Sequence, residues 1–183
     1  KLETGIRVAD VACGHGITTT IMAQAFPNSE FVGFDFHENS IREAQKHATT
    51  HGLSNVRFEV ALAKELPGKF GLATVFDCLH DMGDPVGGMQ HIRAALDSDG
   101  ACMIVEPMAA DTVTENLNPV SRLYYAASTM VCVPTSLAQE TGAALGAQAG
   151  EKRLKEVILE GAGFSQCSRI AETPFNIVLK AQP

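Results

Sequence analysis

The sequence has little that points to a nucleic acid or a membrane. Its 14 Lys and Arg are outnumbered by 21 Asp and Glu, the formal net charge is −7, and basic runs are absent. Because phosphate binding needs clustered cations, we expect no nucleic-acid partner, and an acidic surface also disfavours anionic membranes. The longest apolar-rich stretch, residues 120–138, contains Arg122, Pro134 and several hydroxyl groups. It therefore fails as a membrane span.

Paired cysteine spacings are also missing. The five cysteines are an odd number and form no C-x-x-C pair: Cys13, Cys78, Cys102, Cys132 and Cys167. This pattern indicates neither a zinc motif nor a secreted disulfide framework, so we expect reduced thiols in a cytoplasmic protein. No signal peptide opens the sequence. Because the sequence starts without Met, a few residues before its first expected strand, we expect a natural N-terminal portion to precede it.

What the sequence does contain is an alternation of strand and helix patterns. Strands are expected at 6–12, 30–36, 56–60, 72–76, 101–106, 166–171 and 175–181, with helices at 17–26, 40–51, 86–96 and 151–161. Such alternation predicts an α/β fold: a Rossmann-like, doubly wound, seven-stranded sheet, mostly parallel with an antiparallel edge strand. The length of 183 residues is that of one domain spanning residues 1–183.

A stretch of low charge interrupts the alternation at about residues 108–150. We expect one or two helices there, lying over the sheet edge. One interpretation is a helical lid or substrate insert, in which Tyr124 and Tyr125 help to receive an apolar or aromatic acceptor. The alternative is a plain packing helix or an oligomer contact.

The most informative segment runs from Val8 to Thr18. An apolar strand leads into a glycine-containing turn that opens directly into a helix, so backbone N–H groups face the carboxyl end of the strand. Gly14 and Gly16 would let a ligand approach the backbone closely. In doubly wound sheets, ligands bind at this edge.

A carboxylate follows the second expected strand. Asp35 lies 19 residues after Gly16, where it can accept hydrogen bonds from both hydroxyls of a ribose, or else cap a helix. A dinucleotide-binding turn would carry glycines where this sequence has Ala12 and Thr19. A Tyr-x-x-x-Lys pair is also missing after the fifth strand. A nicotinamide oxidoreductase is therefore disfavoured.

These segments together resemble class I S-adenosylmethionine-dependent methyltransferases. Residues 8–16 are similar to the family's first motif, hydrophobic-x-Asp/Glu-x-Gly-x-Gly-x-Gly, and residues 31–35 to its second. Residues 76–81, 94–100 and the fifth strand also fit, so the resemblance covers nearly the whole chain. It is strongest to bacterial small-molecule enzymes that carry an N-terminal winged-helix or dimerisation domain. It therefore implies a possible homodimer through a missing N-terminal region.

The resemblance implies S-adenosyl-L-methionine as the cofactor. Asp10, Gly14 and Gly16 would bound its methionine part, with Ala12 in the turn and Cys13 lending backbone contacts. Ala12 stands where relatives have a glycine, and we expect a slightly wider turn to absorb the change.

The adenosine part would lie between the next two strand ends. The resemblance implies that Asp35 holds the ribose, that Phe36 flanks the adenine, and that Leu62 and Ala63 lie beside it. Relatives usually have Asp at the position of Leu62, which accepts a hydrogen bond from the adenine amino group. Leu62 cannot, so this contact passes to backbone or water, or is lost at about 1 kcal/mol.

The segment after the fourth strand would carry the chemistry. Phe76 and Asp77 would line the floor under the methionine moiety. His80 is the candidate catalytic base beside the methyl group; alternatively it only shapes the pocket. Asp81 and Glu106 are the other polar groups expected on the substrate side. With Asp77 they form no convincing carboxylate set, so we expect no metal.

The sequence thus predicts S-adenosylmethionine-dependent methyl transfer to a small-molecule acceptor, O- or N-directed. The alternative is a non-catalytic S-adenosylmethionine-binding module or a degenerate partner subunit. Two observations support that alternative: Leu62 replaces the usual Asp, and His80 has two possible roles.

Overall fold

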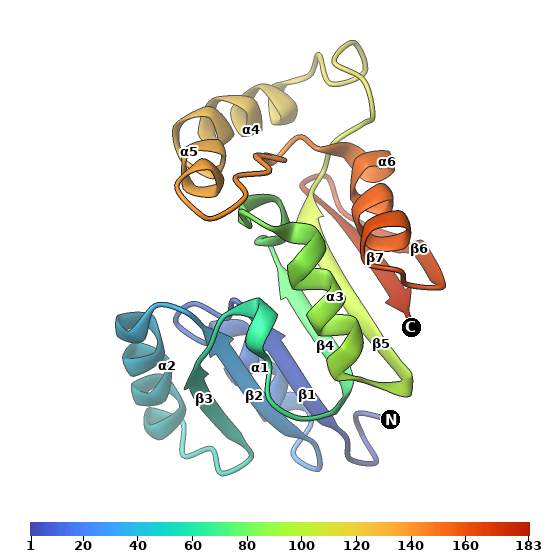
Figure 1. Ribbon diagram of the computed structural model, residues 1–183. Helices are drawn as coiled ribbons and strands as arrows, with labels where there is room; N and C mark the ends of the chain where they lie inside the picture. Colours follow the sequence, from blue (N-terminus) through green and yellow to red (C-terminus); the bar gives the residue numbers. More distant parts are fainter.

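The computed structural model describes all residues, 1–183, as one α/β unit built on a seven-stranded sheet (Figure 1). The strands are β1 Arg7–Val11, β2 Glu30–Asp35, β3 Val56–Val60, β4 Phe70–Phe76, β5 Leu96–Pro107, β6 Gln166–Glu172 and β7 Asn176–Gln182. Their order is β3-β2-β1-β4-β5-β7-β6. Neighbouring strands from β3 to β5 pair in parallel, and β7 pairs antiparallel with both β5 and β6. The predicted fold class is confirmed.

Helices follow most strands. They are α1 Ile17–Ala25, α2 Glu38–Thr50, α3 Pro85–Ala95, α4 Pro119–Met130, α5 Cys132–Leu137 and α6 Gly150–Lys155, with 3-10 turns η1 Ala63–Glu65 and η2 Leu79–Asp81 and the π-helix η3 Glu156–Gly161. Helix α3 begins at Pro85, one residue before the expected start at residue 86, because Pro85 fits its first turn and the Asp84 side chain accepts a hydrogen bond from Gly87 N–H at 2.8 Å. None of the helices combines the length and hydrophobicity that crossing a bilayer requires.

The strand alternation divides the apolar side chains between two faces. On one face, Ala9 and Val11 of β1 belong to the main buried cluster, with α3 and the α6–η3 segment packed on it. On the other face, Val8 and Phe31 pack with α1, and Phe58 packs with α2. Both faces of the central strands are therefore covered, which accounts for their nearly continuous apolar sequences.

Two elements differ from the sequence expectation. Strand β5 begins at Leu96 rather than Ala101, because Leu96 pairs with Phe70 ahead of a register shift that absorbs the intervening turn. The helix expected over 151–161 changes to a π-helix at Glu156. This wider turn buries the consecutive residues Val157 and Ile158 together.

The insert at 108–150 forms two helices, α4 and α5, above the carboxyl ends of the parallel strands (Figure 1). The Tyr124 hydroxyl donates a hydrogen bond to Phe175 O at 2.9 Å, and the Ser136 hydroxyl donates to Met82 O at 2.8 Å. These bonds attach α4 to the turn before β7 and α5 to the segment after β4. The insert is thereby held at the edge where ligands bind in this fold.

We predict that Gly16→Ala destabilises the protein more than Gly52→Ala does. Both glycines have a positive φ, 70° and 63°, so alanine costs about 1 kcal/mol of backbone strain at either site. A Cβ at Gly16 would also lie 2.5 Å from the Phe58 ring, whereas a Cβ at Gly52 meets nothing within 4 Å. Overpacking adds roughly 1–3 kcal/mol. Urea unfolding of both variants measures the difference; equal losses would contradict the packing at Gly16.

Candidate active site

The turn between β1 and α1 has the backbone that the first motif predicts. Ala12, Gly14 and Gly16 all adopt positive φ, at 57°, 54° and 70°. A Cβ at Gly14 would meet nothing within 4 Å, so open space lies above this residue. Ala12 keeps a left-handed backbone, which explains why relatives have a glycine there.

Asp10 lies beneath this turn and is 1% exposed. Its carboxylate accepts hydrogen bonds from the hydroxyls of Thr18 at 2.9 Å, Thr19 at 2.6 Å and Thr74 at 2.8 Å. Burial raises the pKa of Asp10, and the three hydroxyl donors partly offset that rise. With these donors around it, Asp10 ties β1 to α1 and β4 and supports the turn from below.

Asp35 ends β2 beside the turn. Its carboxylate accepts hydrogen bonds from Gly14 N–H at 2.9 Å and from His37 N–H at 2.8 Å. These two contacts leave lone pairs on both oxygens free for further donors. The structure thus joins the glycine turn and the second-strand acid in one place, and the helix cap expected as the alternative for Asp35 is made by His37 instead.

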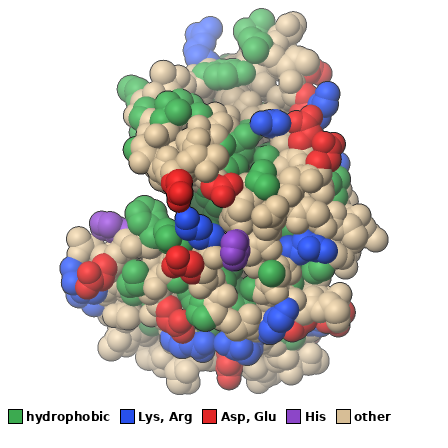
Figure 2. All heavy atoms as spheres, viewed as in Figure 1, with side chains coloured by type: hydrophobic (Ala, Val, Ile, Leu, Met, Phe, Trp, Pro, Cys, Tyr) green, Lys and Arg blue, Asp and Glu red, His purple; other side chains and the backbone are tan.

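A cleft of about 450 Å³ opens beside these residues. It is lined by Ala12, Asp35, Phe36, Ala61, Leu62, Ala63, Lys64, Cys78, Asp81, Met82, Asp84, Gly88, Thr135, Gln139 and Glu140. Phe36 and Leu62 are 64% and 40% exposed, so both present apolar surface to a ligand. Figure 2 shows the hollow between the α4–α5 layer and the part of the molecule that carries α2 and β3, with side chains of both charges at its mouth. Its volume lies within the range of small-molecule sites.

Helix α5 closes one side of the cleft. The Gln139 amide donates to Asp81 O at 2.9 Å and accepts from Gly83 N–H at 3.0 Å, which fastens the end of α5 to the segment after β4. Lys64 and Glu140 form an ion pair at 3.1 Å from opposite sides. Sequence reasoning missed these residues, because they lie 54 or more positions from their partners and belong to no motif.

His80 and Glu106 form a buried pair at the ends of η2 and β5. The His80 Nδ1 and Glu106 Oε2 atoms are 2.5 Å apart, and Glu106 Oε1 accepts from Leu79 N–H at 2.9 Å. His80 is 4% exposed and Glu106 is 1% exposed. Because the carboxylate can only accept, it places the imidazole proton on Nδ1 and leaves Nε2 as the reactive nitrogen.

The charges around His80 change its acidity. Burial lowers the pKa of His80, but the hydrogen bond and charge of Glu106, followed by the charges of Asp81 and Asp77, outweigh it and raise the pKa above the usual value. Burial also raises the pKa of Glu106, and His80 partly offsets this. The imidazole therefore holds a proton to higher pH than an exposed histidine does.

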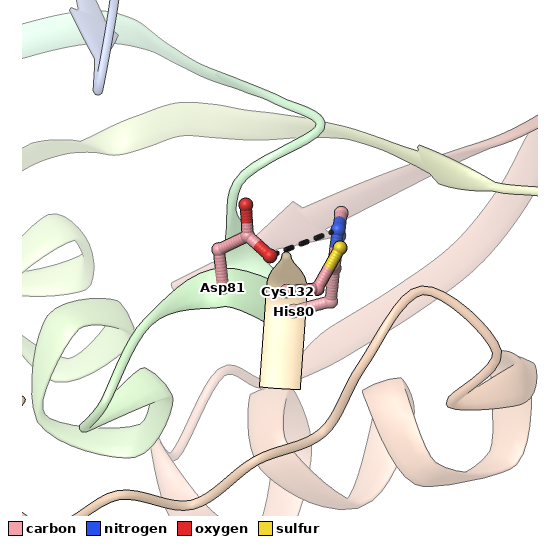
Figure 3. A group of neighbouring side chains, drawn as sticks. All are labelled: His80, Asp81 and Cys132. Carbon is pink, nitrogen blue, oxygen red and sulfur yellow. Dashed lines mark ion pairs between the residues drawn. The ribbon is translucent and has the colours of Figure 1, made fainter. Parts of the chain in front are cut away.

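Two more side chains converge on His80 (Figure 3). Asp81 Oδ1 lies 3.2 Å from His80 Nε2, and the ligand atoms of His80, Asp81 and Cys132 all lie within 4.8 Å of one another. Asp81 was expected on the substrate side, where it lines the cleft. Cys132 was not singled out, because it belongs to the insert and is brought to His80 only by the packing of α5.

The remaining predicted residues are spread around this centre. Asp77 has a positive φ of 48°, and its carboxylate accepts from the Asn176 amide at 3.4 Å. Burial raises the pKa of Tyr124, and the negative charge of Asp77 raises it further. Tyr125 is 37% exposed on α4, and Phe76 is half-buried at the end of β4. The Cys13 thiol packs toward Gly33, which leaves only its backbone beside the turn.

The fold and cleft can now be compared with known proteins. A family model described as "Methyltransferase domain" matches residues 2–162. The chain belongs to this family of methyltransferase domains. The methyltransferase family predicted from the first and second motifs is therefore confirmed.

Curated relatives match parts of the chain. The ubiquinone biosynthesis O-methyltransferase of Leptothrix cholodnii is 34% identical over 94 residues, which are 49% of this chain and 39% of that protein. The corresponding protein of Bordetella avium is 32% identical over 124 residues, 66% of this chain and 47% of that protein. The matched segments thus span less than half the length of these relatives.

Solved structures share the fold over nearly the whole chain. An O-methyltransferase family 2 protein from Planctomyces limnophilus, in complex with apigenin, superposes with a TM-score of 0.75 at 16% identity, covering 97% of this chain and 49% of that one. Human N-acetylserotonin methyltransferase, in complex with S-adenosylmethionine, gives a TM-score of 0.72 at 16% identity, covering 96% and 47%. Because the sequence identity is this low, the structural similarity establishes the fold alone.

We predict that the pKa of His80 exceeds the usual value of about 6.5 and falls in Glu106→Gln. The substitution removes the charge that favours the imidazolium while burial, which disfavours it, remains. A raised folded-state pKa means that His80 stabilises the fold below about pH 6.5, and that this contribution is lost as pH rises through the folded value. Histidine ring NMR against pH measures both pKa values.

The control for this titration is Glu172→Gln, which removes an exposed carboxylate of β6. It leaves the His80 titration unchanged if Glu106 causes the shift. An equal His80 pKa in the wild type and Glu106→Gln would show that the pair does not set the protonation state.

Proposed function

We propose that this chain binds S-adenosylmethionine in the cleft and directs its methyl group to an oxygen of a small-molecule acceptor. The observation that carries the proposal is the meeting of the open backbone at Gly14 with the Asp35 carboxylate, which lines the cleft, in a member of a methyltransferase family. Together they offer a close backbone surface for a charged head group and an acceptor for paired hydroxyls.

The residues present fit this cofactor. The left-handed turn at Ala12, Gly14 and Gly16 would face the methionine part, with Asp10 supporting it from below. Asp35 would hold the ribose through its free lone pairs. The apolar surfaces of Phe36 and Leu62, with Ala63 behind them, would enclose the adenine ring. Leu62 supplies no acceptor for the adenine amino group, so backbone or water takes that contact.

When bound, the cofactor supplies a methyl group activated by the sulfonium. The protein then has to position the acceptor and accept the proton that the acceptor hydroxyl loses. His80 Nε2 is the ring nitrogen that is not bonded to Glu106; it lies in η2, after the end of β4, and faces Asp81 Oδ1 at 3.2 Å. A neutral His80 would take the proton of an acceptor hydroxyl, and Glu106 would stabilise the imidazolium that forms. Because His80 is 4% exposed, acceptor binding has to displace side chains of the α4–α5 layer from the imidazole.

The acceptor side supports an aromatic or otherwise apolar hydroxyl compound. Tyr124 lies near enough to Asp77 for the negative charge of Asp77 to raise the pKa of Tyr124, and α4 and α5 cover this edge of the sheet. The curated relatives are named O-methyltransferases of ubiquinone biosynthesis, and the Planctomyces limnophilus structure contains apigenin. Both names support an O-directed reaction, and Asp81 lines the cleft in which the acceptor would meet the cofactor.

We further propose a cytoplasmic homodimer without a nucleic-acid partner. The five free cysteines are compatible with a reducing compartment, and the net charge is −7. The insert exposes Leu117, Leu123 and Met130 by 79%, 63% and 73%. The three side chains belong to one segment of the chain, and if they form one apolar patch, a partner surface would cover it.

Calorimetry with S-adenosylmethionine, S-adenosylhomocysteine and NAD tests the cofactor assignment. We expect both sulfur compounds to bind and NAD to give no response. Binding followed by turnover on a panel of phenols supports the enzyme, whereas binding without turnover on any acceptor supports a non-catalytic module. Binding of NAD alone would refute the cofactor assignment.

We predict that Asp35→Ala weakens S-adenosylmethionine binding more than tenfold, because charge-assisted hydrogen bonds to the ribose are lost. Asp35→Asn keeps one acceptor oxygen and should lose less. Asp97→Ala, an exposed acid at the opposite end of β5, is the matched control and should bind as the wild type does. Unchanged affinity in Asp35→Ala would show that Asp35 does not bind the ribose.

We also predict that kcat/KM for a hydroxyl acceptor rises with pH through a pKa above about 6.5, since only neutral His80 accepts a proton. His80→Gln should lower kcat/KM by about 100-fold or more and remove this rise. Circular dichroism and cofactor affinity check that the variant is folded. If His80→Gln retained the wild-type pH profile, His80 would not be the base and would only shape the pocket.

A further inference from the structure

Three potential metal ligands meet beside the cofactor cleft: an imidazole, a carboxylate and a thiol. His80 Nε2 and Asp81 Oδ1 are 3.2 Å apart, and both lie within 4.8 Å of Cys132 Sγ. Figure 3 shows the Asp81 carboxylate pointing toward the imidazole, with the Cys132 sulfur beside the ring nitrogen. The first two residues come from η2 and the third from α5, so tertiary packing creates the group.

The contact between His80 and Asp81 is not completed by a hydrogen bond. Asp81 Oδ1 is buried and has no hydrogen-bond partner, although Nε2 is close to it. When the imidazole is neutral, with its one proton on Nδ1, two lone pairs face each other across this contact. The contact becomes favourable when Nε2 binds either a second proton or a metal ion. Two ligands at zinc distances of about 2.0–2.1 Å and a tetrahedral angle lie roughly 3.3 Å apart, close to the observed separation.

Glu106 adds the outer contact that a metal-bound histidine requires. Histidine ligands of metals almost always donate their second ring N–H to a carboxylate, backbone carbonyl or water, which fixes the tautomer and raises the basicity of the ligating nitrogen. Glu106 accepts from His80 Nδ1 at 2.5 Å and is itself held by Leu79 N–H. The imidazole is therefore already oriented with Nε2 toward Asp81 and Cys132.

The ligand types select the ion. Thiolate and imidazole together favour zinc and other softer divalent ions over magnesium or calcium, which take oxygen ligands. One thiolate and one carboxylate would neutralise a divalent ion, so the three ligands and the ion together would carry no net charge. Asp81 also lines the cleft, which leaves a path for a fourth ligand such as water.

We propose that His80, Asp81 and Cys132 form a zinc-binding site, and that a bound ion occupies the nitrogen needed to accept a proton from the acceptor. Above the pKa of His80 the Cys132 thiol is the group that loses a proton on binding, so one proton is released to solvent. Below that pKa the Nε2 proton of the imidazolium is released as well. The inhibitory consequence rests on the proposed function, because it follows only if His80 is the base. Binding of the ion does not depend on that role.

Zinc titration of the chelator-treated protein tests the site. We expect one ion per chain, bound at about micromolar Kd or tighter, with proton release seen as a buffer-dependent heat. Cys132→Ser and Asp81→Asn should each weaken binding at least tenfold, while Cys167→Ala, a cysteine of β6, should leave it unchanged. Cobalt in place of zinc should give thiolate charge-transfer absorption that disappears in Cys132→Ser.

The outcomes separate the site from the catalytic proposal. Wild-type zinc affinity in both Cys132→Ser and Asp81→Asn, or no binding by the wild type, would overturn the site. Thermal melting checks folding, since zinc should raise the Tm of the wild type but not of Cys132→Ser. If zinc binds and methyl transfer continues at its full rate with saturating ion, the site stands and the base role of His80 is refuted.

Discussion

A single buried carboxylate holds the ligand-binding edge of this protein together. Asp10 lies at the end of β1 and accepts hydroxyl hydrogen bonds from α1 on one side and β4 on the other. Burying a charge costs several kcal/mol unless donors surround it, and three threonines do so here. With Asp10 satisfied, the left-handed turn above it is fixed where β1 and β4 diverge, and the cleft forms beside that turn.

A second buried acid, Glu106, fixes the orientation of His80 at the same edge of the sheet. Glu106 is held by Leu79 N–H and in turn holds His80, so the tautomer of the imidazole is set before any ligand arrives. Both acids lie at strand ends of one sheet, because parallel strands bring their carboxyl ends to one edge. The two roles proposed for Nε2, proton transfer and metal binding, use the same orientation of the imidazole, so they would exclude each other at one atom.

The insert adds what the sheet edge lacks. Helices α4 and α5 cover the strand ends, and Gln139 fastens the end of α5 to the segment after β4. The Lys64–Glu140 ion pair spans the mouth of the cleft, but its exposed ends make it a weak fastening compared with the buried Ser136–Met82 hydrogen bond. The carboxyl ends of the parallel strands therefore supply the backbone that faces the ligand, and the insert covers the cleft beside them.

The sequence alone determined the sheet, the glycine turn and the acid at Asp35. These are local patterns: alternating apolar runs, a strand that meets a helix through glycines, and a carboxylate at a fixed distance along the chain. The family followed from them, as did the one or two helices expected in the insert and a helix beginning close to residue 86. The shifted start of β5 did not, because it depends on pairing with Phe70, and the π-helix depends on burial of Val157 and Ile158 together.

Only the tertiary structure decided which distant residues meet. His80 and Cys132 are 52 positions apart, and no spacing rule connects a residue after β4 with one in the insert. The support of the turn by Thr74 and the closure of the cleft by Gln139 are likewise contacts between elements. Sequence periodicity reports which face of an element is buried, whereas the partner across the interface is set by how the elements pack.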